Sequence, residues 1–119
     1  MDNKSFLLNF RRTKKVKIGD REVTCKGLTV GDLELMDRKH KPKEGENVNE
    51  LEWMTDLIML GVLDENGERM FSDDERELVK QLDTEVFGKL ADTVFELSPF
   101  NEKAVEEAEK NSEEARSGK

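Results

Sequence analysis

Apolar side chains recur in the middle of the chain at the spacing of a helix face. Intervals of three and four residues separate Leu51, Met54, Leu57, Ile58 and Gly61. Because an α-helix turns once in about 3.6 residues, these positions fall on one side of a helix. Asn49, followed three residues later by Glu52, supplies a helix start. The pattern predicts a helix over about residues 49–62 that buries this side.

A second helix face follows further along the chain and is formed by Val86, Phe87, Leu90, Val94 and Leu97. Its segment begins at Asp83-Thr84 and ends at Ser98-Pro99, since proline disfavours helical geometry in the residue before it. We expect a helix over about residues 84–98. Trp53 and Phe95 lie beside the two faces, so the first helix is either buried on two sides or offers Trp53 to a partner.

Near the N-terminus the sequence alternates as a β-hairpin does. The apolar residues on the two sides of a Gly19-Asp20 turn are Val16, Ile18, Val23 and Cys25. This pattern predicts two short strands over about residues 14–25. An isolated hairpin is marginally stable in water, so we expect this one to lie on the helices that follow.

Two further helix starts carry the residues of a capping box, in which paired side chains satisfy free amides at the beginning of a helix. The two pairs are Thr29 with Asp32 and Ser72 with Glu75. They predict helices over about residues 29–39 and 73–82. The second of these helices is expected to be short, with Leu78, Val79 and Leu82 as its apolar positions.

Together these elements predict an α+β fold that is mainly α. We expect a hairpin packed on a small bundle of about four helices, within a single compact domain over residues 1–100. From Glu102 onward apolar residues are sparse and acidic residues frequent. Residues 101–119 are therefore expected to form an acidic tail that is helical or disordered.

One stretch of the sequence carries a resemblance to a known family. A helix ending in Leu60-Gly-Val-Leu is followed by Asp-Glu-Asn-Gly-Glu-Arg-Met-Phe-Ser-Asp-Asp-Glu, which ends at Glu75. A helix around residues 90–97 and a closing Glu-Lys-Asn at Asn111 complete the pattern. It resembles the tail assembly chaperones of long-tailed, siphovirus-type bacteriophages, and the resemblance spans roughly residues 25–111.

The resemblance implies a function in binding and not in catalysis. Members of that family coat the long, helical tape measure protein and keep it soluble until the tail tube polymerises around it. A longer form, made by ribosomal frameshifting, recruits the tail tube protein. Such a protein acts in the host bacterial cytoplasm and is not expected in the mature virion. The alternative is a small acidic adaptor or regulatory protein that binds a basic site on a host or phage protein.

Charge is distributed unevenly along the chain. Charged residues make up 40% of the 119 residues, and the net charge is −8. Residues 1–43 contain 12 Lys and Arg against 6 Asp and Glu, whereas residues 44–119 contain 8 against 22, so the two parts carry +6 and −14. Opposite charges at the two ends favour a weak head-to-tail homo-oligomer, although the same asymmetry can simply keep a small protein soluble.

The basic part of the chain also holds the most concentrated candidate contact surface, where aromatic residues and leucines are followed by arginines and lysines. Binding of DNA or RNA is disfavoured, because the acidic remainder of the chain repels phosphate. The surface is expected to meet a partner or a second copy, or to close the fold's own core. With the aromatic residues further along the chain, the candidate contact residues are Phe6, Phe10, Arg11, Arg12, Lys14, Lys15, Trp53, Phe95 and Phe100.

The sequence contains little of the chemistry that enzymes and metal sites need. Its single histidine, His40, lies between two lysines and is expected to be solvated. Its single cysteine, Cys25, is expected to be a small core residue. We therefore expect no enzyme activity, cofactor or metal. No membrane span is expected either, because no apolar run reaches about 18 residues.

Overall fold

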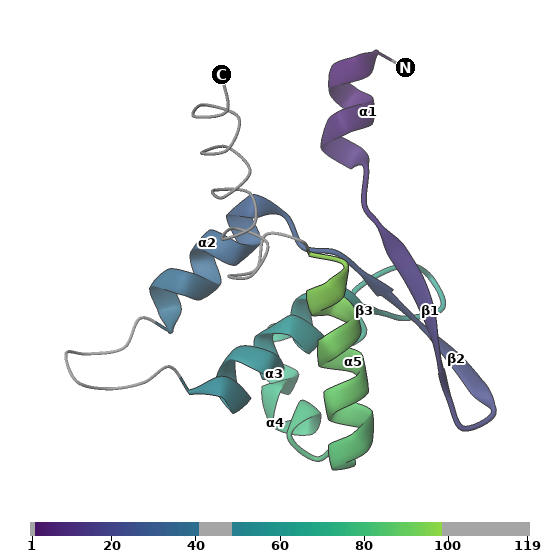
Figure 1. Cartoon of the computed structure of the whole chain (residues 1–119), viewed down its shortest axis with the longest axis vertical. Helices are drawn as coiled ribbons and strands as arrows, with labels where there is room; N and C mark the ends of the chain where they lie inside the picture. Colours follow the sequence, from purple (N-terminus) through teal and green to yellow (C-terminus); the bar gives the residue numbers. More distant parts are fainter. Residues whose placement is uncertain (1, 41–48, 99–119) are drawn as a thin grey trace, which may run out of the picture.

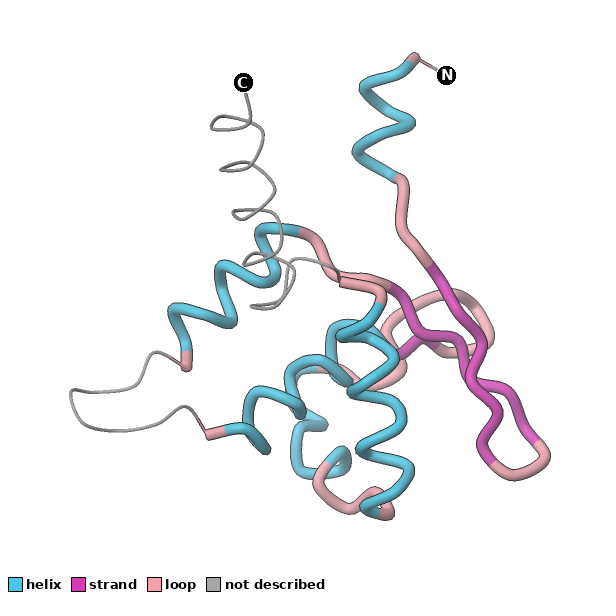
Figure 2. Tube along the Cα trace, viewed as in Figure 1, coloured by secondary structure: helices cyan, strands magenta, loops and turns pink. Residues whose placement is uncertain are grey.

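The computed structural model of the protein describes residues 2–40 and 49–98. These residues form an α+β fold in which a β-hairpin is followed by helices, in agreement with the sequence-based prediction. Figure 1 and Figure 2 show the sheet beside a group of helices, with the first helix projecting away from both. The predicted tail, residues 101–119, lies outside the described residues.

Three strands form one antiparallel sheet in the order β1-β2-β3. They are β1 Thr13–Ile18, β2 Arg21–Lys26 and β3 Val62–Leu63. The predicted hairpin is confirmed, with Val16 opposite Val23. Gly19 in its turn has a φ of +62°, which glycine adopts without steric cost. β3 is missing from the prediction, because two residues directly after a helix leave no alternation to recognise.

Two long helices supply most of the core. α3 Glu50–Gly61 packs against α5 Thr84–Glu96, and α5 also packs on β1 and β2. The two predicted apolar faces contribute the buried residues Leu57, Ile58, Leu90 and Val94. A Cβ atom added to Gly61 would lie 2.5 Å from Cγ1 of Val94. Only glycine therefore permits the close contact of α3 with α5 at this point.

The hairpin lies on the helices, as expected, and reaches the core through Val16 and Cys25. Polar contacts from α5 hold its outer strand as well. The Lys89 Nζ donates a hydrogen bond to the carbonyl oxygen of Lys17 at 2.8 Å. An exposed ion pair joins Lys14 to Glu96 at 3.9 Å and contributes little in water.

α2 Val30–Lys39 begins with the predicted capping box. The Asp32 amide donates to the Thr29 hydroxyl at 3.0 Å, and the Thr29 amide donates to the Asp32 carboxylate at 3.1 Å. Met36 is the buried residue of α2, and Leu35 beside it is exposed. α2 thus makes a narrow contact with the core at the edge of the helical group (Figure 1).

The helix predicted over residues 73–82 is shorter than expected. The capping box of Ser72 and Glu75 is formed, but it opens a 3₁₀ helix, η1 Asp73–Glu75, and then a single α-helical turn, α4 Arg76–Val79. After α4, the amides of Gln81 and Leu82 donate to carbonyl oxygens three residues back instead of four. This tighter winding ends the α-helix early.

Two leucines at apolar positions of the predicted helices are exposed, and one of them, Leu51, was predicted to be buried. The exposed fraction is 66% for Leu51 and 46% for Leu78. Helical periodicity gives the direction of a side chain around its helix, but not how far the neighbouring element extends along it. Leu51 lies in the first turn of α3 and Leu78 in the single turn of α4, so neither position is covered.

The N-terminal segment forms a helix, α1 Asn3–Asn9, that the sequence analysis does not predict. Asp2 caps it by accepting the Ser5 amide at 2.7 Å, and this bond lowers the pKa of Asp2. None of the residues of α1 is buried. The apolar residues of this segment therefore do not close the fold's own core, which was one of the two roles considered for them.

Because burial differs along α3, replacing two leucines of this helix by alanine should lower the free energy of unfolding by different amounts. Leu57→Ala removes a buried side chain and should lower the free energy of unfolding by about 2–5 kcal/mol. Leu51→Ala is the matched control and should change it by less than about 0.5 kcal/mol. Urea denaturation followed by circular dichroism measures both values. Equal losses in the two variants would contradict this assignment of the core.

Candidate partner-binding surface

The candidate residue Phe6 lies on α1, and Phe10 lies directly after this helix, before β1 begins. Figure 1 shows α1 projecting away from the rest of the fold. With Leu7 and Leu8, these two phenylalanines form a set that we call the α1 surface, and their exposed fractions lie between 54% and 69%. The rings of Phe6 and Phe10 lie 6.0 Å apart between centroids. Large apolar side chains within one short segment thus face water instead of the core.

The basic candidate residues follow α1 directly. Arg11 turns back and donates from Nη1 to the carbonyl oxygens of Leu8 and Phe10, at 3.1 and 2.6 Å. This closes the end of α1, where carbonyl groups otherwise lack partners. The other basic candidates, all exposed, are Arg12, Lys14 and Lys15. Six of the nine predicted contact residues therefore lie in one continuous segment, which runs from α1 into β1.

Trp53 and Phe95 lie elsewhere, at the edge of the core. Their ring centroids are 5.4 Å apart and their planes meet at 73°, the edge-to-face arrangement that aromatic pairs prefer. Both side chains are half-buried and pack against the core, so neither is offered freely to a partner. Phe100 lies outside the described residues. The sequence pattern thus groups residues that the structure separates.

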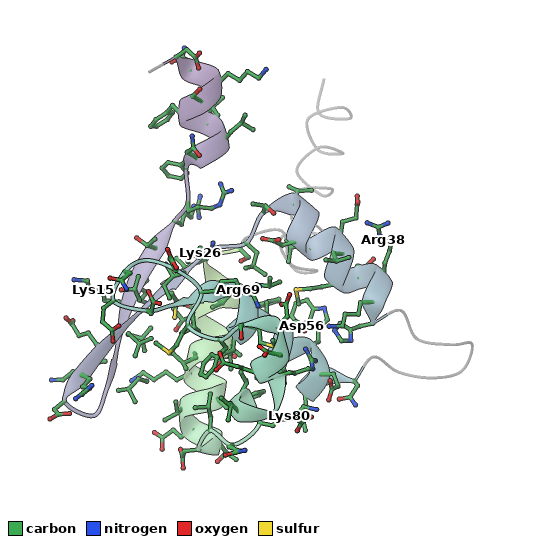
Figure 3. The ribbon with its side chains drawn as sticks, turned by 180° about the vertical axis from the view of Figure 1, so that it is seen from behind. Lys15, Lys26, Arg38, Asp56, Arg69 and Lys80 are labelled. Atoms are coloured by element: carbon green, nitrogen blue, oxygen red, sulfur yellow. The ribbon has the colours of Figure 1, made fainter. Side chains whose placement is uncertain are left out.

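A polar cluster that the sequence analysis misses joins α2, α3 and α4. Asp56 of α3 is only 5% exposed, and its carboxylate accepts hydrogen bonds from Arg76, Lys39 and His40. Arg76 also donates to the carbonyl oxygen of Glu52 at 3.0 Å and to its carboxylate at 2.7 Å. Figure 3 shows Asp56 in the interior, among the helices that supply these partners.

The pKa values of the two carboxylates follow from these contacts. Burial raises the pKa of Asp56, but the hydrogen bonds to it, led by that of His40, lower it more, and the net pKa lies below the usual range. Hydrogen bonds from Lys80, at 2.7 Å, and from Arg76 lower the pKa of Glu52 to about 2. Both carboxylates are therefore ionised at neutral pH and hold their cations in place.

His40 is not solvated, contrary to the expectation from its charged neighbours in the sequence. Its side chain is 11% exposed and contacts Asp56. The sequence does contain a signal for this cluster, namely Asp56 within an apolar helix. A buried carboxylate needs hydrogen-bond donors nearby, so Asp56 indicates that such donors come from other elements. The sequence does not say which donors, since His40 and Arg76 are 16 and 20 residues away from Asp56.

A half-open hollow of about 290 Å³ lies beside this cluster, between α2 and α3. Its apolar wall consists of Leu35, Met36, Met59 and Leu60. Arg69 on its rim donates to the Met59 carbonyl oxygen at 2.7 Å and to the Asp73 carboxylate at 2.9 Å. The cationic side chains around the hollow are hydrogen-bonded to groups of the protein itself, so their role in the structure is to hold the fold together.

The buried groups offer little reactive chemistry. Burial raises the pKa of the Cys25 thiol to about 11, so the thiol is protonated at neutral pH. Within residues 2–40 and 49–98, no group of three or more His, Cys, Asp or Glu side chains is placed to hold a metal ion. Over the same two ranges, no helix has both the length and the apolar character needed to cross a bilayer.

Comparisons of the chain with protein-family models, with curated proteins and with solved structures find no match. Function is therefore inferred from the residues described above. Among them the α1 surface points most directly to another molecule, because it exposes large apolar side chains that take no part in the core.

The lowered pKa of Glu52 predicts a loss of stability in acid. This pKa is about 2 in the folded protein, against 4.5 for an unperturbed glutamate. A carboxyl group whose folded pKa is depressed stabilises the fold above its unfolded pKa, and the stabilisation is lost as the pH falls through the folded value. The thermal midpoint, measured by circular dichroism, should therefore decline between pH 4.5 and about pH 2.

Glu52→Gln should lower the midpoint at neutral pH and remove part of this acid decline. Glu34→Gln is the matched control, because Glu34 forms only an exposed ion pair with Arg38 on α2. The control should follow the wild-type profile. An acid decline that is unchanged in Glu52→Gln would show that Glu52 is not one of the groups responsible.

Proposed function

We propose that the chain acts by binding proteins and not by catalysis, as a tail assembly chaperone of long-tailed bacteriophages. The observation that carries the proposal is the α1 surface, whose four large apolar side chains are more than half exposed on and directly after a helix with no buried residue. A basic segment follows it directly and adds charge to the apolar contact. Apolar surface of this kind, rimmed by polar residues, is typical of protein interaction sites.

The energetics of α1 also favour a partner. A helix shorter than roughly 12–15 residues is marginal in water on its own, and α1 has seven residues. Its Asp2 cap satisfies one free amide, but none of its residues is buried against the rest of the described fold. Burial of a leucine or phenylalanine side chain contributes about 1.5–3 kcal/mol. Contact with a partner would therefore supply stabilisation that the described residues outside α1 do not give to this helix.

The resemblance around residues 60–75 suggests which partner this is. A tape measure protein is a long helical chain whose apolar stripes aggregate unless they are covered, and an amphipathic helix is a suitable ligand for an apolar surface. In this proposal a longer, frameshifted form recruits the tail tube protein. The chain acts in the host cytoplasm without a cofactor, nucleic acid or membrane, and it leaves the tail before the virion is complete.

The alternative is an acidic adaptor or regulatory protein that binds a basic site on a host or phage protein. The net charge of −8 and the consecutive acidic residues Asp73, Asp74 and Glu75 favour it. The two functions differ in gene position, because a tail assembly chaperone should be encoded directly upstream of a very long open reading frame. A gene without such a neighbour would favour the adaptor.

Substitutions in the α1 surface should abolish partner binding and spare the fold. In co-expression with the tape measure protein encoded downstream, the unmodified chain should keep that protein in the soluble fraction. The double variant Phe6→Ser with Phe10→Ser should lose this effect, since it removes both rings of the surface. Its thermal midpoint should stay unchanged, because neither ring is buried.

The matched control is Val30→Ser with Leu51→Ser, which also replaces two exposed apolar side chains but on α2 and α3. It should solubilise the tape measure protein as the unmodified chain does. Equal loss in both double variants would remove α1 as the specific contact. An unmodified chain that leaves the tape measure protein insoluble would overturn the chaperone function itself.

Head-to-tail association should be weak and sensitive to salt, because residues 1–43 carry +6 and residues 44–119 carry −14. Unlike patches on one chain form a heterologous contact, which gives rings or open arrays. Exposed charges are screened over roughly 8–10 Å at physiological ionic strength. Sedimentation at rising protein concentration should show larger species that shrink as salt is added.

Replacement of Arg11, Arg12, Lys14 and Lys15 by Glu should abolish these species, while circular dichroism stays helical because all four side chains are exposed. A protein that stays monomeric at high concentration and low salt would contradict the self-association and leave partner binding by α1 as a separate question.

A further inference from the structure

Among the strands of residues 2–40 and 49–98, β1 is an outer strand of the sheet and pairs with β2 alone. In an antiparallel pair, residues bonded to the partner strand alternate with residues whose backbone groups point away from it. The Gly27 amide donates to the Arg12 carbonyl oxygen at 2.8 Å, so Arg12 and every second residue after it face β2. The backbone N–H and C=O groups of Thr13, Lys15 and Lys17 therefore point to the open edge.

One end of this edge is already covered by α5. The Lys89 Nζ donates to the Lys17 carbonyl oxygen at 2.8 Å, which agrees with the outward direction of that carbonyl group. Thr13 and Lys15 have no such cover, because no residue in the described ranges 2–40 and 49–98 bonds to their outward backbone groups. These two residues offer donors and acceptors in the alternation that an added antiparallel strand requires.

The side chains along this edge are basic. Lys15 and Lys17 are exposed on the same face of β1, and Figure 3 shows Lys15 projecting outward from the hairpin. Lysines on an edge strand disfavour pairing with a second copy of the same strand, since like charges then lie opposite one another. The same lysines favour a strand with acidic side chains at alternate positions.

We propose that the open edge of β1 accepts an extended acidic segment of a partner protein, which adds a further strand to the sheet. Main-chain hydrogen bonds with Thr13 and Lys15 set the register of the added strand, and the lysines select acidic side chains. This surface is distinct from the α1 surface, and it does not depend on the identity of the partner proposed above.

The probe is a short synthetic peptide of alternating valine and glutamate, and its control is a peptide of alternating valine and lysine. Each is titrated into the isotopically labelled full chain, and backbone hydrogen exchange is followed by NMR. The glutamate peptide should slow exchange of the Thr13 and Lys15 amides by about tenfold, because each gains a hydrogen bond. The amides of Lys14 and Val16, already directed at β2, should change little. The lysine peptide should protect none of them.

Two substitutions of Lys15 separate the main-chain bond from the charge. Lys15→Thr removes the charge and keeps the outward N–H group. Lys15→Pro removes both and leaves the bonds to β2 in place, since proline is tolerated where an edge strand's N–H group faces outward. The affinity for the glutamate peptide should be about tenfold lower for Lys15→Pro than for Lys15→Thr. Protected amides at Lys14 and Val16 verify the hairpin in each variant.

Equal affinities of the two variants would overturn the proposal, and so would protection of Thr13 and Lys15 by both peptides or by neither. Protection that grows with protein concentration in the absence of peptide would overturn it as well, because the occupant would then be a second copy. If Lys15→Pro loses the hairpin, the exchange measurement on the unmodified chain decides alone. Failure of the chaperone function leaves these outcomes unchanged, since no tape measure protein is present.

Discussion

The buried carboxylate of Asp56 is the constraint on which the arrangement of the helices depends. Removing a carboxylate from water costs several kcal/mol unless cations and hydrogen bonds compensate for it. α3 cannot supply these donors from its own apolar face, so they come from Lys39 and His40 at the end of α2 and from Arg76 at the start of α4. The position of one side chain therefore limits where both other elements can lie.

α2 shows the consequence of this constraint. It buries only Met36, which is too little apolar surface to fix a helix of ten residues. Its start is held nearby by the Leu28 amide, which donates to the Ser98 hydroxyl at 2.9 Å, and its end is held by the Asp56 cluster. α2 is therefore held at both ends but contacts the core narrowly between them. This leaves the hollow beside α3 partly open.

The sequence predicted the elements whose signals are local. Alternation gave the hairpin, periodicity gave α3 and α5, and the side chain of Thr29 gave the start of α2. The missed features depend on distant contacts: β3 is a strand only because β2 lies beside it, and Asp56 is a buried ion only because donors arrive from other helices. The contact surface divides in the same way. Its residues from Phe6 to Lys15 are neighbours in the chain and their part in binding stays a prediction, whereas Trp53 and Phe95 pair with each other at the edge of the core.

The N-terminal segment differs from the helices held by the Asp56 cluster, because no comparable set of hydrogen bonds among the described residues holds α1. Within the described residues, α1 leads into β1 and its apolar residues contribute nothing to the core, so we expect changes there to act on binding more than on folding. The net charge of −8 opposes acidic ligands at long range, but exposed charges interact only within about a Debye length, roughly 8 Å at physiological salt. Within that distance of β1, the nearby lysines and arginines determine the electrostatic interaction with a ligand. The lysines at the edge of β1 therefore attract an acidic partner segment at close range, so charge favours this edge as a site of contact.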